Sequence, residues 1–102
     1  MKKIINGIKY NTETAKEVGF YDNGLGYGDF HHVEETLYRK RNGKFFLYGH
    51  GGPASKYCVS VGTNEWSGGS DLIPLTEDEA KEWGEEHMSV EEYEDVFGEV
   101  EE

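Results

Sequence analysis

The sequence predicts a single α+β domain over residues 1–98, in which an antiparallel β-sheet packs against helices. The chain has 102 residues, of which 14% are aromatic, and this is enough for one modest core. The dipeptide Asn-Gly occurs twice within β-forming runs, at positions 6–7 and 42–43, and this pattern is typical of hairpins. Two Ser/Thr-x-x-Glu patterns, typical of helix starts, begin at Thr76 and Ser89.

The first third of the chain predicts a hairpin, a short helix and a loop. Residues 4–10 form the hairpin candidate, because Asn-Gly supplies the positive φ angles of a type I′ turn. The stretch "YNTETAKEVG" predicts a short N-terminal helix of two turns, with Asn11 as its cap and Gly19 at its end. Three glycines within residues 20–29 then predict a loop.

The middle of the chain has the strongest strand signal, "HVEETLYRKRNGKFFLYG", in which two β-forming runs flank the Asn-Gly at positions 42–43. A two-residue turn places Leu37 opposite Tyr48, whereas a bulged turn places Leu37 opposite Leu47. The sequence does not distinguish between these two registers. Residues 55–62 predict a further strand and residues 63–71 a loop.

The C-terminal quarter predicts two amphipathic acidic helices, each opened by one of the capping patterns. We expect their aromatic residues Trp83, Tyr93 and Phe97 to be largely buried against the sheet. A glycine at position 98 stops the second helix, and residues 99–102 are predicted to form a frayed acidic tail.

Charge is distributed unevenly in this chain, whose formal net charge is -11. Residues 77–102 hold 13 of the 21 acidic residues. Two capped helices would display these acids as an ordered negative surface that can bind a basic groove, since carboxylates can replace phosphates there. A purely solvated face is the alternative. The acids assigned to this candidate surface are Glu85, Glu86, Glu91, Glu94 and Asp95.

The stretch "RKRNGK" places a cluster of positive charge at the tip of the second predicted hairpin, in a chain whose net charge is negative. Its cations are Arg39, Lys40, Arg41 and Lys44. The tip can protect a sheet edge, lie against the acidic helices, or bind a phosphate backbone, which arginine contacts in bidentate fashion. For the third case guide RNA is the partner we expect.

No metal or other cofactor is expected from the histidine and cysteine positions. None of them has a recognised ligand spacing, and adjacent histidines on a strand point to opposite faces. The residues considered are His31, His32, His50, Cys58 and His87. The single cysteine excludes an internal disulfide.

No catalytic motif is recognisable, so we expect a protein that is not an enzyme. "YGHGGP" resembles an esterase oxyanion loop, but the GxSxG nucleophile motif is missing. "GLGYGD" has the pattern GxGxG, without the third glycine at the spacing of a dinucleotide-binding loop. There is no signal peptide and no membrane-spanning run, which predicts a cytoplasmic protein with no membrane partner.

Five segments taken together carry a family resemblance. They are "MKKIINGIKYNTETAKEVG", "EETLYRKRNGKFFLYGHGGPASKY", "WSGG", "IPLTEDEAKEWGEEH" and "FGEVEE". In their order and spacing they resemble small acidic proteins of phages and mobile elements of Gram-positive bacteria, which are related to type II anti-CRISPR proteins.

This resemblance implies an inhibitor that binds a type II CRISPR effector nuclease, or its guide RNA, and blocks it without catalysis or a small-molecule substrate. Two alternatives remain at this stage. One is an accessory or regulatory protein of a mobile element that binds another host protein. The other is a small hydrolase with an unrecognised site.

Overall fold

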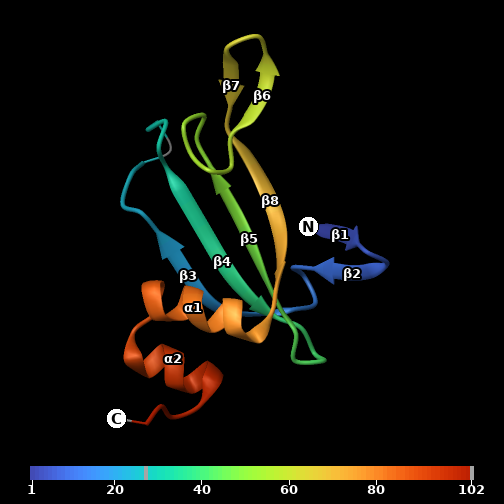
Figure 1. Ribbon diagram of the computed structural model, residues 1–102, viewed down its shortest axis with the longest axis vertical. Helices are drawn as coiled ribbons and strands as arrows, with labels where there is room; N and C mark the ends of the chain where they lie inside the picture. Colours follow the sequence, from blue (N-terminus) through green and yellow to red (C-terminus); the bar gives the residue numbers. More distant parts are fainter. Residues whose placement is uncertain (27, 102) are drawn as a thin grey trace.

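The computed structural model describes residues 1–26 and 28–101 and has the predicted α+β architecture (Figure 1). All strand pairs are antiparallel, with a four-stranded sheet in the order β3-β4-β5-β8 and two separate hairpins, β1–β2 and β6–β7. The elements are β1 (Lys2–Ile5), β2 (Ile8–Asn11), β3 (Lys16–Asp22), β4 (Val33–Arg39), β5 (Phe45–Gly51), β6 (Val59–Gly62), β7 (Glu65–Ser67), β8 (Gly69–Leu75), α1 (Glu77–His87) and α2 (Val90–Phe97).

The Asn-Gly pairs at 6–7 and 42–43 both lie in hairpin turns, but the two turns differ. Asn6 and Gly7 have φ angles of 52° and 77°, as a type I′ turn requires. In the β4–β5 turn only Gly43 has a positive φ, 85°. Its N–H donates to the carbonyl of Lys40 at 2.9 Å, which closes a type I turn followed by a bulge. The bulged register follows, with Leu37 opposite Leu47.

The predicted N-terminal helix is absent, and this part of the prediction was wrong. Asn11 does cap a turn, since its side chain accepts from the Glu13 N–H at 2.9 Å and its carbonyl accepts from the Ala15 N–H at 3.1 Å. The chain makes a single turn here and does not continue as a helix, because β3 begins at Lys16 and pairs with β4. Gly19 therefore lies inside a strand rather than at a helix end.

Two further sequence assignments change in the structure. Residues 63–71 were predicted as a loop, but they contain all of β7 and the first half of β8. Of the strand predicted over 55–62, only the part from Val59 onward is a strand. The predicted loop at 20–29 begins with the end of β3, and its position 27 lies outside the described residues.

The four-stranded sheet is covered on both faces. On one face, Leu37, Phe45 and Leu47 pack against Ala80 and Trp83 of α1. On the other face, Phe46 and Leu72 pack against Tyr10 of the β1–β2 hairpin, and the Tyr10 and Phe46 rings meet edge to face at 5.5 Å. Because successive side chains of β5 point to opposite faces of the sheet, this strand contributes residues to both cores.

The helices begin at Thr76 and Ser89, each with both reciprocal hydrogen bonds of a capping box. Trp83 is buried, whereas Tyr93 and Phe97 are partly buried. The reason is that α2 lies mainly beside α1 rather than on the sheet; Phe97 reaches the core through Phe45, at 5.3 Å between ring centroids.

A buried polar network lies between the sheet and α1. The carboxylate of Glu35, only 2% exposed, accepts from the Trp83 indole N–H at 3.1 Å, from the Tyr57 hydroxyl and from the Lys56 ammonium. Burial raises the pKa of Glu35, but these donors outweigh it and hold the pKa below its ordinary value. Burial and the bond to Glu35 raise the pKa of Tyr57. The network thus holds an ionised carboxylate inside the fold.

Residues 99–101 form neither helix nor strand, and position 102 lies outside the described residues. No helix among the described residues has the length and apolar character needed to cross a bilayer.

Candidate functional site

The β4–β5 turn presents the predicted basic tip as a fixed shape. The Lys40 N–H donates to the Lys44 carbonyl at 2.7 Å, and the Lys44 N–H donates to Asn42 Oδ1 at 3.1 Å. Arg39, Arg41 and Lys44 are exposed, whereas Lys40 is half-buried because its ammonium lies 4.4 Å above the Tyr10 ring. The four cations are thus carried by the end of β4 and a hydrogen-bonded turn rather than by a loose loop.

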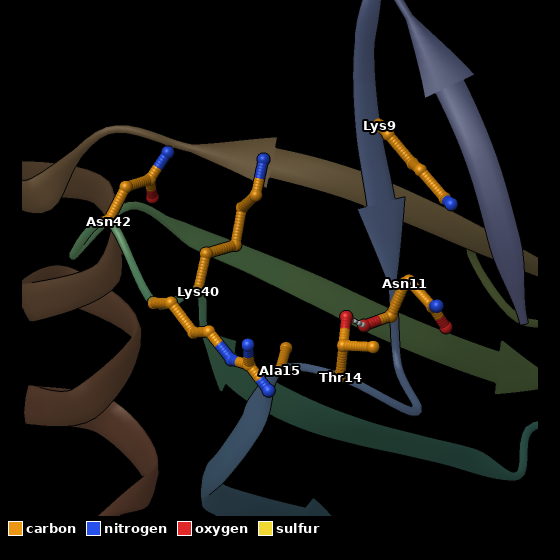
Figure 2. Close-up of a pocket in the computed structure, with 7 residues that line it drawn as sticks. Lys9, Asn11, Thr14, Ala15, Lys40 and Asn42 are labelled. Carbon is orange, nitrogen blue, oxygen red and sulfur yellow. Dashed lines mark hydrogen bonds between the residues drawn. The ribbon is translucent and has the colours of Figure 1, made fainter.

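A hollow of about 370 Å³ separates this turn from the N-terminal hairpin (Figure 2). Lys9 on β2 lines it from one side, and Lys40, Arg41 and Asn42 of the turn line it from the other. Thr14 lies at its edge and bonds to the Asn11 carbonyl at 3.4 Å. The β1–β2 hairpin therefore adds a cation that sequence reasoning did not assign to the tip.

A second hollow, of about 410 Å³, continues the first one past the β2–β3 turn. It shares Lys40 and Arg41 with the first hollow and adds Lys16 and Arg39, which are cross-strand partners on β3 and β4. We call the two together the basic groove. Its cations are five of the ten Lys and Arg residues of the chain: Lys9, Lys16, Arg39, Lys40 and Arg41.

The lining of the basic groove favours anion binding. Among the described residues, the lining contains hydroxyl, amide, guanidinium and ammonium groups but no carboxylate and no histidine. None of the groove cations forms an ion pair within residues 1–26 and 28–101. A groove of this charge is suited to a chain of phosphates.

Lys44 stands apart from the groove. It faces a hollow on the far side of the turn, which it shares with Glu77 and Glu79 at the start of α1. The structure therefore divides the predicted basic tip, with three of its cations in the groove and Lys44 beside the first acids of the helix.

The predicted acidic surface is present on the two helices, with one correction. Glu85, Glu86, Glu91 and Asp95 are exposed. Glu94 was expected to be exposed as well, but it is half-buried because its carboxylate folds back to accept the Val100 N–H at 3.2 Å. The acids are held on capped helices, and they lie on elements separate from the groove.

Lys9 and Lys16 are the residues that sequence reasoning missed at this site. A signal existed for Lys9, because the Asn-Gly turn at 6–7 folds β2 back toward the body of the protein. Lys16 was hidden because its segment was assigned to a helix. Its position opposite Arg39 depends on the β3–β4 pairing, which is a tertiary contact.

No protein-family model, no curated protein and no solved structure matches this chain.

Proposed function

We propose that this chain is a non-catalytic inhibitor of the anti-CRISPR type, which binds a type II RNA-guided nuclease or its guide RNA and blocks it. The observation that carries the proposal is the opposition of charge within one small domain. The basic groove and the acidic helices occupy different elements, so a single partner must offer both signs to engage them together.

A ribonucleoprotein offers both signs of charge. Its RNA backbone is anionic, and the channel that holds the nucleic acid is positively charged. The groove arginines can grip phosphates with two parallel hydrogen bonds each, and the lysines act as point charges. The acids on α1 and α2 would be repelled by RNA but attracted to the basic protein channel.

The family resemblance of the sequence supports the same partner. It covers segments at both ends and in the middle of the chain, including the "RKRNGK" turn and the start of α1. It implies an inhibitor that acts by binding, which agrees with a groove that is lined by five cations.

The test is a binding measurement with three partners: the nuclease alone, its guide RNA alone and the assembled complex. We expect the tightest binding to the assembled complex and a loss of DNA cleavage that follows the occupancy of the complex. Binding to none of the three would contradict the proposal, and cleavage that continues on saturated complex would contradict the inhibitory part of it.

The acidic helices provide a second arm of the test. The variant carries Glu85→Gln, Glu86→Gln, Glu91→Gln and Asp95→Asn. Because these side chains are exposed, the fold should tolerate all four changes. We expect slower association with the nuclease and a weaker effect of added salt on the association rate. If association is unchanged, the acids serve as a solvated face.

A further inference from the structure

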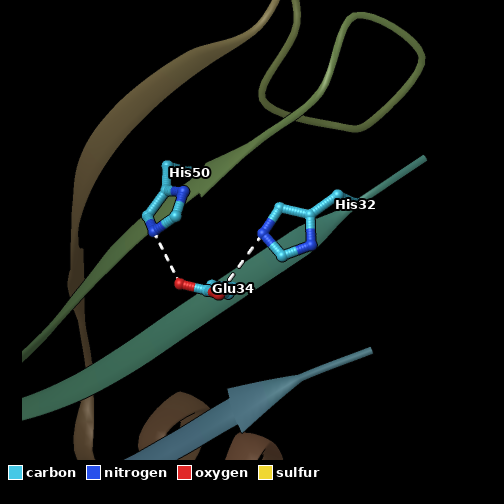
Figure 3. Close-up of side chains that lie close together, drawn as sticks. All are labelled: His32, Glu34 and His50. Carbon is cyan, nitrogen blue, oxygen red and sulfur yellow. Dashed lines mark ion pairs between the residues drawn. The ribbon is translucent and has the colours of Figure 1, made fainter. Parts of the chain in front are cut away.

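Two histidines and one glutamate meet at the end of the sheet that lies away from the basic groove. Glu34 on β4 and His50 on β5 are direct cross-strand partners, and His32 precedes Glu34 by two residues, so their side chains share a face. Their ligand atoms all lie within 4.8 Å of one another. Figure 3 shows the two imidazoles pointing at the carboxylate from either side.

We propose that His32, Glu34 and His50 form a binding site for a divalent transition-metal ion, for which Zn²⁺ is the ion of choice. Two imidazole nitrogens and one carboxylate oxygen are a common set of protein ligands for zinc. This site is independent of the basic groove and of the inhibitory function.

The distances fit such an ion after small side-chain rotations. Glu34 Oε2 lies 2.9 Å from His50 Nε2, and Glu34 Oε1 lies 3.4 Å from His32 Nε2. Zinc bonds of about 2.0–2.2 Å in a tetrahedral arrangement separate neighbouring ligand atoms by about 3.3 Å. Both separations are close to this value, but they end on different oxygens of Glu34, so the carboxylate must bind through both oxygens or rotate to bring one of them toward both imidazoles.

The tautomer of His32 supports the assignment. Its Nδ1 contacts the backbone carbonyl of Leu25, and a carbonyl oxygen can only accept, so Nδ1 carries the hydrogen. In the neutral ring the lone pair is then on Nε2, the atom that faces Glu34 and His50. A backbone carbonyl that orients the second nitrogen is the usual support of a metal-binding histidine.

Burial also suits a metal site with one open position. The His32 side chain is 4% exposed and the Glu34 side chain 16%, whereas the His50 side chain is 31% exposed. An ion held here is enclosed on the side of His32 and reaches water on the side of His50, where solvent can complete its coordination. It would connect β4, β5 and the loop that carries Leu25.

The competing occupant is a proton. If His32 or His50 is protonated, the same contacts are ion pairs with Glu34 and no metal is needed. The test must therefore detect the ion itself rather than the stability of the cluster.

The experiment is calorimetric titration of ZnCl₂ into the full chain without a histidine tag, after removal of metals with EDTA. We expect saturation at one Zn²⁺ per chain and a melting temperature that rises with Zn²⁺, because the ion binds only the folded state. In a parallel titration Co²⁺ should give visible absorption bands of a coordinated ion. Absence of saturable binding would overturn the proposal.

Variants then locate the ion. Glu34→Gln and His50→Gln should each weaken Zn²⁺ binding at least about tenfold, whereas His31→Gln, at the exposed neighbouring histidine, should leave it unchanged. Saturable binding that survives both ligand variants would also overturn the proposal. If Glu34→Gln does not fold without metal, His50→Gln decides the outcome, because its side chain is partly exposed.

Discussion

Trp83 donates its indole N–H to the carboxylate of Glu35 across a distance of 3.1 Å, and this bond joins α1 to the second strand of the sheet. The two residues are 48 positions apart in the sequence. Both are buried, so neither can exchange its partner for water. The hydrogen bond therefore fixes where α1 lies on the sheet, beyond what apolar packing of the helix alone would specify.

The first prediction separates this bond from the packing of the ring. Trp83→Phe keeps an aromatic side chain but removes the N–H donor, and we expect it to lower the free energy of unfolding by about 1–3 kcal/mol. Trp83→Ala also leaves a cavity and should cost about 3–5 kcal/mol. Urea unfolding measures both.

Trp66→Phe is the control for this first prediction, because Trp66 is 58% exposed. It should change stability by less than about 0.5 kcal/mol. Equal losses from Trp83→Phe and Trp66→Phe would show that the bond to Glu35 contributes nothing measurable.

The second prediction concerns acid. The pKa of the folded Glu35 carboxyl lies below its ordinary value of 4.5, so its ionised form stabilises the native state above that pH. This stabilisation is lost as the pH falls below 4.5 and through the lowered pKa. In Glu35→Gln the contribution is absent at every pH, so we expect a variant that is less stable at pH 7 and whose stability changes less between about pH 5 and about pH 3.

Unfolding midpoints at several pH values test this second prediction, and the slope from one such group is at most about 1.4 kcal/mol per pH unit. Glu82→Gln changes an exposed carboxylate on α1 and should keep the wild-type pH dependence. If Glu35→Gln and the wild type lose stability in parallel on acidification, Glu35 is not the group responsible.

The third prediction concerns the space that Gly49 leaves for Tyr57. A Cβ at this position would overlap Cζ and the hydroxyl oxygen of the Tyr57 ring. Gly49→Ala must therefore displace the phenol that bonds to Glu35. We expect a loss of about 1–3 kcal/mol from overpacking, measured by thermal unfolding.

Gly26→Ala is the matched control for Gly49→Ala, since a Cβ at position 26 meets nothing within 4 Å. It should be neutral or slightly stabilising. The double variant Gly49→Ala, Tyr57→Ala should lose less than the sum of the single variants, because the clash is then gone. Strict additivity would contradict the steric conflict between the two positions.

The fourth prediction concerns the basic groove. Lys9→Glu, Arg39→Glu and Arg41→Glu together should greatly weaken binding to the guide RNA complex. If each cation binds a phosphate, the slope of log affinity against log salt should become shallower by about 1 for each phosphate that is no longer neutralised. Circular dichroism of the free variant checks the fold.

A comparison within the same turn provides the control for the groove. Arg41 and Lys44 are both exposed, but only Arg41 lines the groove. We expect Arg41→Glu to weaken binding clearly more than Lys44→Glu does. Equal effects would mean that the partner contacts the whole tip rather than the groove.

The parts of the fold that depend on residues close together in the chain were predictable from the sequence. The α+β class follows from the two kinds of element signal, and Thr76 opens α1 through a capping box made by its own neighbours in sequence. The helix expected after Asn11 does not form. The prediction was wrong because the same capping hydrogen bonds open a single turn and a longer helix. Pairing of β3 with β4 decided between them, and that contact is not local.

The polar clusters were harder to predict because each depends on register. His32 lies directly before β4 and its side chain approaches that of Glu34, a proximity that the spacing of two residues could have indicated. His50 joins them only because the bulged β4–β5 turn places it opposite Glu34. The sequence left that register open, and the alternative would have moved every β5 side chain by one position.

The β6–β7 hairpin extends beyond the end of the four-stranded sheet, and every one of its residues is exposed (Figure 1). Its opening would remove no side chain from either core, so its backbone amides should exchange with deuterium by local fluctuation, far faster than those of β4 and β5. The same independence makes its tip, at Thr63–Asn64, a permissive place for an inserted tag or a fluorophore, distant from the groove that binding experiments need to leave intact.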